Sequence, residues 1–218
     1  MGETEVTQGL WWKVMGGNDP SHFKSGDEYP VESVSWDDCQ DFLRKLNLQS
    51  PVAGFQWRLP TEAQWEYACR AGSSGAFAGT GRLDDMGWND GDKTHSVARK
   101  KANAWGFHDM HGNAHEKCAG KNGILRGGGV DDPAIWCRSA VRFDVERSVQ
   151  EKINKMVRLI QEEGLNPNAD PALLTHREME KMKKTAIKLI EEGTFFDPER
   201  FMENLERTIG FRPVFKGK

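Results

Sequence analysis

The uneven distribution of tryptophan constrains the fold of this chain more than any other feature. All eight tryptophans of the 218 residues precede residue 137, and from Arg147 to Thr208 the sequence has no tryptophan and only two glycines. In that second stretch Val149, Ile153 and Ile160 follow one another at helical spacing, which predicts helices. The chain therefore divides into a body rich in tryptophan and glycine and a helical segment over residues 147–208.

Two helices are expected in the body. Ser35 is a good N-cap, and the apolar residues that follow it, from Cys39 to Leu46, recur at helical spacing. Thr61 caps the second helix, which should end at Gly72. Residues 73–111 form a long irregular stretch, and such stretches often carry function. Extended segments are expected at residues 5–7, 11–15, 124–126, 136–143 and 209–215.

Charge and hydropathy exclude two classes of partner. The formal net charge is -3 and the basic residues are scattered. The basic run from Arg99 to Lys101 is interpreted as a solvated loop, so no nucleic-acid partner is expected. No apolar run reaches the roughly 18 residues that a membrane span needs. The polar start, from Met1 to Glu5, shows no secretory signal.

Several stretches together resemble the formylglycine-generating enzyme (sulfatase-modifying factor) family. They are YPVESVSWDD (29–38), FQWRLPTEAQWEYACRAG (55–72), WGFHDMHGNAHE (105–116), ILRGGG (124–129), CRSAVR (137–142) and IGFRPVF (209–215). The resemblance implies an α+β chain with a variant of the C-type lectin-like fold, formed by residues 1–146 and 209–218. Residues 147–208 are not part of the usual pattern and are expected to be a helical segment inserted before the last strand.

The oxidases of this family convert a sulfatase cysteine to formylglycine with two cysteines that bind copper shortly after a Gly-Gly-Ser turn. A pair of soft thiolates suits Cu(I). In this chain the turn is Gly127–Gly129, and the stretch from Val130 to Trp136 contains no cysteine. We therefore expect a protein that is not an enzyme. The alternative is a metal-dependent enzyme of the wider family, with a metal bound by histidines.

A further branch of the family consists of ligand-binding proteins that diversity-generating retroelements diversify, with variable residues on this same C-terminal stretch. Here Cys137, Arg138 and Ser139 fit the family, whereas their neighbours do not. The resemblance thus implies a face that binds a protein or glycan ligand, formed by His115, Lys117, Val130, Asp131, Asp132, Ile135, Trp136, Val141, Phe143 and Asp144. Two alternatives stay open: sequence drift in a structural domain, and an accessory module whose inserted helices dock a partner.

The loop before residue 117 raises the question of a metal. By resemblance, a calcium site is formed by two carboxylates and two backbone carbonyls, those of Asp109, Gly112, Ala114 and Glu116. Hard oxygen ligands suit Ca²⁺, and ordinary turn hydrogen bonding is the alternative. Zinc-ligand residue types also occur here, at His108, His111, His115 and Cys118. A Gly-Asn turn interrupts that run, so these histidines are interpreted as loop residues.

The cysteines carry an expectation about location. Cys69 and Cys137 match positions that form a disulfide in some relatives, which would tie the second helix to the C-terminal stretch. Such a bond favours an oxidising compartment, so an extracellular or cell-surface location is expected. Cys39 lies on an apolar helix face and is expected to be a buried thiol. The state of Cys118 stays open.

Overall fold

The computed structural model describes residues 1–49, 55–120, 123–145, 158 and 209–217. The chain divides into two compact units, one formed by Met1–Asp144 with Glu203–Lys218 and the other by Val145–Met202. The helices predicted between residues 147 and 208 lie outside the described residues, except for Arg158, which is helical. No helix in the described ranges is long and apolar enough to cross a membrane.

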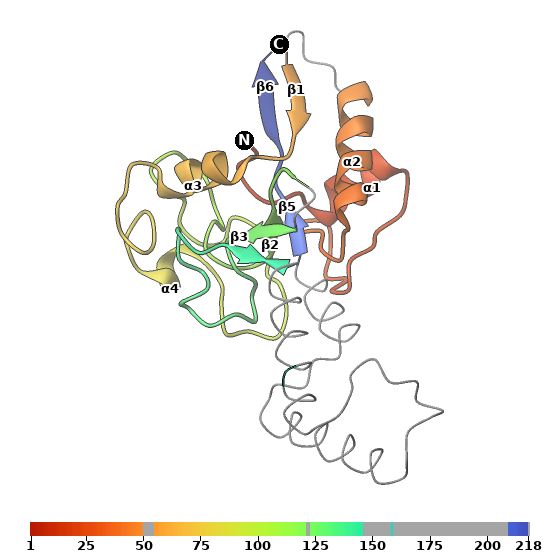
Figure 1. The fold of residues 1–218 in the computed structure, drawn as a ribbon. Helices are drawn as coiled ribbons and strands as arrows, with labels where there is room; N and C mark the ends of the chain where they lie inside the picture. The colour runs from red at the N-terminus through yellow and green to blue at the C-terminus, as the bar shows by residue number, and fades with distance from the viewer. Residues whose placement is uncertain (50–54, 121–122, 146–157, 159–208, 218) are drawn as a thin grey trace. The chain divides into compact units, whose positions relative to one another are not determined.

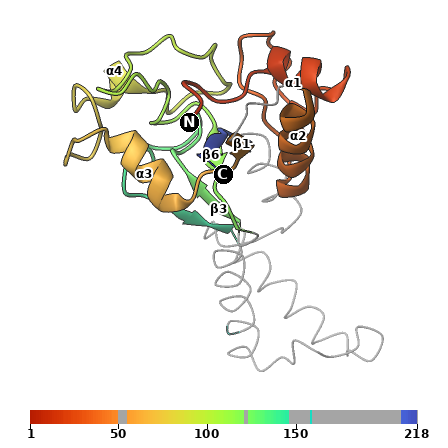
Figure 2. The same ribbon diagram turned by 90° about the horizontal axis from the view of Figure 1, so that it is seen from above.

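The helices of the first unit lie in two groups. They are α1 (Gln8–Met15), α2 (Trp36–Gln49), α3 (Glu62–Arg70) and the short α4 (Leu83–Met86). In both views α1 and α2 lie on one side of the strands, with α3 and α4 on the other (Figure 1, Figure 2). The start of α3 is a capping box, because Thr61 accepts from the Gln64 amide at 3.2 Å and Gln64 accepts from the Thr61 amide at 3.0 Å. The predicted helices at Ser35 and Thr61 are both present.

The strands form two small sheets. An antiparallel pair is formed by β1 (Phe55–Arg58) and β6 (Val214–Gly217). A second sheet has the order β4 (Phe143–Asp144), β3 (Ile124–Arg126), β2 (His115–Lys117) and β5 (Ile209–Phe211), and β2 and β5 run parallel. Glu116 lies opposite Gly210 in that parallel pair. The last described residues therefore complete both sheets.

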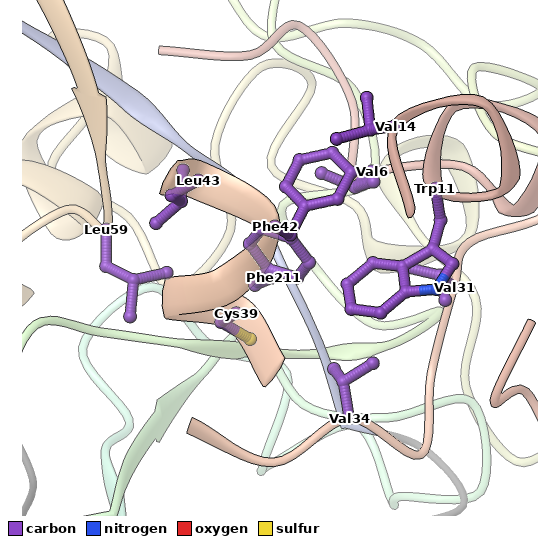
Figure 3. Packing of buried hydrophobic residues seen from close by; sticks show 10 residues of the cluster. All are labelled: Val6, Trp11, Val14, Val31, Val34, Cys39, Phe42, Leu43, Leu59 and Phe211. Carbon is purple, nitrogen blue, oxygen red and sulfur yellow. The ribbon is translucent and has the colours of Figure 1, made fainter. Parts of the chain in front are cut away.

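The larger core cluster lies between α1, α2 and β5 (Figure 3). The ring of Trp11 stacks on Phe42 at a centroid distance of 5.1 Å, and Phe211 meets Phe42 edge-on at 5.2 Å. All three side chains are buried. Burying an aromatic side chain contributes roughly 1.5–3 kcal/mol, so β5 stabilises the N-terminal helices directly. A smaller cluster contains Trp65, Cys69, Met110 and Cys118.

Two predicted strands are wrong, and a third is interrupted. Residues 11–15 belong to α1, because the Thr7 side chain caps the helix by accepting from the Leu10 amide at 3.2 Å and both Trp11 and Val14 reach the core. Residues 136–142 form turns with local bonds such as Val141 N–H to the Arg138 carbonyl at 3.0 Å. The strand expected over 209–215 is split into β5 and β6 by Arg212 and Pro213.

Candidate functional site

Buried and exposed side chains both occur along residues 130–144, which we call the contact segment. Val130, Cys137 and Ser139 are at most 1% exposed, whereas Ile135 is 60% and Trp136 is 40% exposed. Buried anchors therefore separate side chains that face solvent. The buried side chains fix the backbone of this segment, and Ile135 and Trp136 face solvent.

Arg126, the last residue of β3, holds the contact segment in place. Its buried guanidinium donates to the Ser139 carbonyl at 2.9 Å and to the Glu66 carboxylate at 2.6 Å. Ser139 in turn donates its amide to the Ala76 carbonyl at 2.8 Å. Burial alone would raise the pKa of Glu66, but hydrogen bonds from Arg70 and Arg126 lower it below the usual range. The Glu66 carboxylate is thus ionised and fixes the arginine.

A second ion pair joins the contact segment to α3. Arg142 donates from Nε and from one terminal nitrogen to the two oxygens of Glu62, both at 2.9 Å. This fork-on-fork geometry fixes direction as well as distance. Glu62 lies in the first turn of α3 and Glu66 one turn later. Two residues of α3 therefore fix the contact segment: Glu62 through Arg142, and Glu66 through Arg126 of β3.

A row of rings leads from the exposed face to a buried histidine. Trp136 and Phe143 lie 5.4 Å apart between ring centroids, and Phe143 and His115 lie 6.3 Å apart. The His115 Nε2 atom is 3.0 Å from Asp132 Oδ2, while its Nδ1 has no hydrogen-bond partner among the described residues. Burial alone would raise the pKa of Asp132, but the His115 hydrogen bond and charge lower it.

The predicted contact residues fall into three groups. Exposed side chains are those of Asp131, Ile135 and Trp136. Half-buried side chains are those of Lys117, Asp132, Val141, Phe143 and Asp144. The remaining two are buried, and the expectation that Val130 and His115 lie on the exposed face is wrong. Val130 packs against Gly91, and His115 lies within β2, where the sheet and the Phe143 ring cover it.

Asn113 connects the contact segment to the irregular loops before it. Its amide donates to the Trp88 carbonyl at 3.0 Å, and its own carbonyl accepts from Val130 at 3.0 Å. Its side chain accepts from the His95 amide at 2.8 Å and donates to Glu5 at 3.2 Å. These bonds explain how a stretch with little regular structure is held, since nearly every polar atom of this buried asparagine has a partner.

Cys69 and Cys137 are free thiols, so the predicted disulfide is not present. The His111 ring contacts both residues. Its Nε2 accepts from the Ala78 amide at 2.9 Å and lies 3.7 Å from Cys69 Sγ, and its Nδ1 lies 2.8 Å from the Cys137 carbonyl. Because Nε2 accepts, Nδ1 carries the proton and donates. Burial raises the pKa of each thiol to about 12, so neither is reactive.

The side chains of zinc-ligand type, which were interpreted as loop residues, do not converge on one point. The Nδ1 of His108 bonds the Lys100 carbonyl at 2.9 Å, and His111 and His115 have the separate partners given above. Cys118 lies in the smaller core cluster. Within the described ranges no group of three or more histidine, cysteine, aspartate or glutamate side chains has an arrangement that holds a metal.

The predicted calcium residues lie in a buried cluster of charges. Arg212 donates to both oxygens of Glu116 at 3.0–3.2 Å, and Trp65 Nε1 donates to Glu116 at 2.9 Å. Asp109 accepts from the Ala98 amide at 2.7 Å with one oxygen, and its other oxygen has no partner among the described residues. The carboxylate of Glu116 is therefore committed to a guanidinium.

Glu5 and Asp109 complete this cluster. Glu5 lies 3.9 Å from Arg212, and burial followed by the charge of Asp109 raises its pKa well above the usual range. Burial also raises the pKa of Glu116, against the opposing effects of Arg212 and Trp65. One oxygen of Asp109 has no partner among the described residues. Both oxygens of Glu116, the other carboxylate of the predicted set, are bound by Arg212. The set of Asp109, Gly112, Ala114 and Glu116 therefore does not fit a calcium ion.

Sequence reasoning missed the residues that hold the site. Glu62 and Glu66 lie inside the quoted motif of the second helix, yet nothing in the local pattern indicates that they pair with Arg142 and Arg126, 80 and 60 residues later. Asn113 was visible only as part of a turn. Such partners are set by the tertiary fold, so no local signal identifies them.

The comparisons with known proteins agree with this architecture. A family model, described as the sulfatase-modifying factor enzyme 1-like domain, matches residues 1–156. A curated relative, the chaperone protein LppX of Paenibacillus barcinonensis, is 29% identical over 54% of this chain and 60% of its own length. This chain therefore spans about three fifths of that relative.

Two solved structures are also similar. Treponema denticola variable protein 1 is 29% identical with a TM-score of 0.60, and the match covers 66% of this chain and 77% of that one. PvdO from Pseudomonas aeruginosa is 25% identical with a TM-score of 0.53, covering 64% of this chain and 71% of that one. The matches confirm the predicted C-type lectin-like fold and the predicted likeness to variable proteins.

Proposed function

The chain belongs to the family of the sulfatase-modifying factor enzyme 1-like domain, and from that premise we propose that it is a ligand-binding protein. The contact segment is the binding surface, and its partner is a protein or a glycan. The observation that carries the proposal is the exposure of Ile135 and Trp136 between the buried Val130, Cys137 and Ser139. Exposed aromatic side chains on a rigid backbone are good binding anchors.

The likeness to a protein named for its variability supports a second part of the proposal. The exposed positions of the contact segment tolerate substitution, because Arg126 and α3 hold its backbone through main-chain and charged contacts. The exposed side chains contribute little to those contacts. A change at position 135 or 136 therefore alters recognition while the fold stays intact.

Oxidase activity is not part of the proposal. The four cysteines are all buried, and burial raises the pKa of each thiol to about 12. A thiolate pair for Cu(I) also needs two neighbouring cysteines, and none lies between Val130 and Trp136. Incubation with copper and a sulfatase-type cysteine peptide is expected to yield no formylglycine above the peptide-only background, measured by mass spectrometry. Conversion at the rate of a true oxidase would contradict this.

The binding proposal is tested with the full chain on arrays of glycans and of cell-surface protein domains. Trp136→Ala is expected to weaken binding to any ligand found by about tenfold or more, which is the effect of losing an aromatic anchor. Trp12→Ala is the matched control, because Trp12 is 56% exposed on α1 and is not part of the contact segment. Equal affinities of both variants and the unchanged protein would refute the assignment of this surface.

A further inference from the structure

The contact segment carries carboxylates at its start, which we call its acidic border: Asp131 and Asp132, with Asp90 from the adjoining turn. Asp131 is exposed at its start, and the turn that contains Asp90 is hydrogen-bonded to it. The Gly91 amide donates to the Val130 carbonyl at 2.7 Å, and the Asp90 amide donates to the Asp132 carbonyl at 3.2 Å. Two stretches of chain about forty residues apart in sequence therefore bring their carboxylates to one edge of the surface.

Two of these carboxylates have no ion pair among the described residues. Asp132 is engaged by His115 at 3.0 Å. The side chain of Asp90 accepts from the neutral side chain of Asn89 at 2.5 Å, and within the described ranges neither Asp90 nor Asp131 has an ion pair. On the basic side, Arg142 is paired with Glu62. Arg138 is the basic side chain of the contact segment that faces solvent without an ion pair in the described chain.

The thiol of Cys137, the residue after Trp136, is buried, and the nearby carboxylates act on its pKa. Burial raises its pKa to about 12, and the charges that raise it further are those of Asp132, Asp90 and Asp131. At Cys69, burial and the charge of Glu116 raise the thiol pKa, whereas the Ser139 hydrogen bond and the charges of Arg126 and Arg212 lower it. Asp132, Asp90 and Asp131 therefore lie close enough to Cys137, the residue after Trp136, to act on its thiol.

We propose that the partner of the contact segment is a protein segment that presents lysine or arginine. Its cation lies against the rings of Trp136 and Phe143, and Asp90 and Asp131 compensate its charge. The inference rests on the proposed binding function and names its chemistry. Charge complementarity favours this partner over a neutral glycan. A cation at this place is attracted both by the indole ring and by the neighbouring carboxylates.

The test uses the immobilised full chain and three dodecapeptides of alternating alanine with lysine, glutamate or serine. The lysine peptide is expected to bind, and its affinity is expected to fall as salt rises from about 50 to about 200 mM, because surface charge pairs are screened. Replacing Asp90 and Asp131 together, D90N with D131N, should weaken that binding about three- to tenfold, the size expected for two exposed charge contacts.

A matched control removes the same charge elsewhere. Asp27 and Asp84 are exposed, and D27N with D84N gives the same net charge as the test variant. This control is expected to bind the lysine peptide like the unchanged protein. Equal weakening by both pairs would show general attraction to an acidic protein and would overturn the proposal, as would preference for the serine or glutamate peptide.

Failure of this inference is distinguishable from failure of the proposed function. If Trp136→Ala weakens binding of a ligand found on the arrays but the Asp90 and Asp131 substitutions do not, the surface binds a partner of other chemistry and only the inference falls. If the aspartate pair matters for the lysine peptide and Trp136→Ala has no effect on any ligand, the ring surface is not the binding site, and both fall.

Discussion

Arg212 compensates most of the buried charge in the first unit, where it faces Glu5, Asp109 and Glu116. Its guanidinium is fully buried and also donates to the Glu3 carbonyl at 2.7 Å. Arg212→Met keeps an unbranched apolar stem but removes the guanidinium, which leaves the three buried carboxyl groups without a cation. We expect the free energy of unfolding to fall by about 3–5 kcal/mol, the usual cost of breaking a buried pair from one side. Urea unfolding followed by tryptophan fluorescence measures it.

The control for that substitution is Arg142→Met. Arg142 is half exposed and pairs with Glu62, so its loss should cost at most about 1 kcal/mol. A similar cost for the two substitutions would mean that the buried cluster is more hydrated than its contacts indicate, and would contradict the role given to Arg212.

Glu5 predicts a pH dependence. Burial and the neighbouring Asp109 raise its pKa in the folded state well above 4.5. A carboxyl with a raised folded pKa contributes stability below its unfolded pKa, and that contribution is lost as pH rises through the folded pKa. Glu5→Gln cannot ionise, so its stability relative to the unchanged protein should increase as the pH rises above 4.5 towards the folded-state pKa of Glu5, and it should stay constant at lower pH.

Urea unfolding at several pH values tests this, with Glu3→Gln as the control, because the Glu3 side chain is 74% exposed. The control should show no comparable trend. A stability difference for Glu5→Gln that is flat across the range, or that falls with rising pH, would show that Glu5 is ionised at no cost in the folded protein.

Sequence reasoning predicted the contact residues only in part. Ile135 and Trp136 are as exposed as the prediction requires, whereas Val130 is buried. Residue type does not separate these cases, since all three are apolar. What separates them is the bond from Val130 to Asn113 and the turn of residues 89–92 that covers it, and both depend on tertiary contacts.

At the scale of elements, the helix caps were predicted correctly and the extended segments only in part, since residues 124–126 are β3 whereas residues 11–15 are helical. Ser35 and Thr61 begin α2 and α3 as expected, because a cap acts within four residues. Trp11 and Trp12 are good strand residues, yet they form α1 because Trp11 and Val14, three apart, both reach the core that Phe42 and Phe211 complete. The helical interpretation of those residues depends on partners about 30 and 200 positions away.

The contacts from α3 through Arg126 to the contact segment lead to a prediction about the mobility of that segment. Glu66→Gln removes the charge that fixes Arg126, and Arg126 holds the Ser139 and Ala140 carbonyls. We expect hydrogen exchange of the Ser139 and Val141 amides to become faster, by about tenfold, while α3 amides stay protected; losing a charged hydrogen bond costs about 1.5–3 kcal/mol. Mass spectrometry of deuterated peptides measures the exchange.

Glu62→Gln is the comparison for that experiment, since Glu62 holds the segment through an ion pair with the more exposed Arg142. Its effect should be smaller and confined to residues near 142. Unchanged exchange over 137–144 in Glu66→Gln would mean that the backbone bonds alone hold the contact segment, and the role of Arg126 would be limited to packing.

At the scale of the whole molecule, the two ends of the sequence meet. The Val6 amide donates to the Phe211 carbonyl at 3.0 Å, and the Gly2 amide donates to the Pro213 carbonyl at 2.9 Å. The motif from Ile209 to Phe215 therefore belongs to the lectin-like body, although about sixty residues of different composition precede it. Only the resemblance to a family predicted this arrangement. No local pattern in the sequence connects residues 2–6 with residues 211–213.

Calcium tests the body as a whole, because a bound ion would join the loop of Asp109 and Gly112 to Glu116. In the structure, the carboxylate of Glu116 accepts hydrogen bonds from Arg212 and Trp65 instead. We therefore expect the same unfolding midpoint, within about 1 °C, in excess CaCl₂ and in excess EDTA. A site filled at a thousand times its dissociation constant would add about 4 kcal/mol, which is several degrees. A calcium-dependent rise of that size, abolished by Asp109→Asn, would show that Arg212 yields its place and that the buried oxygen of Asp109 is a ligand.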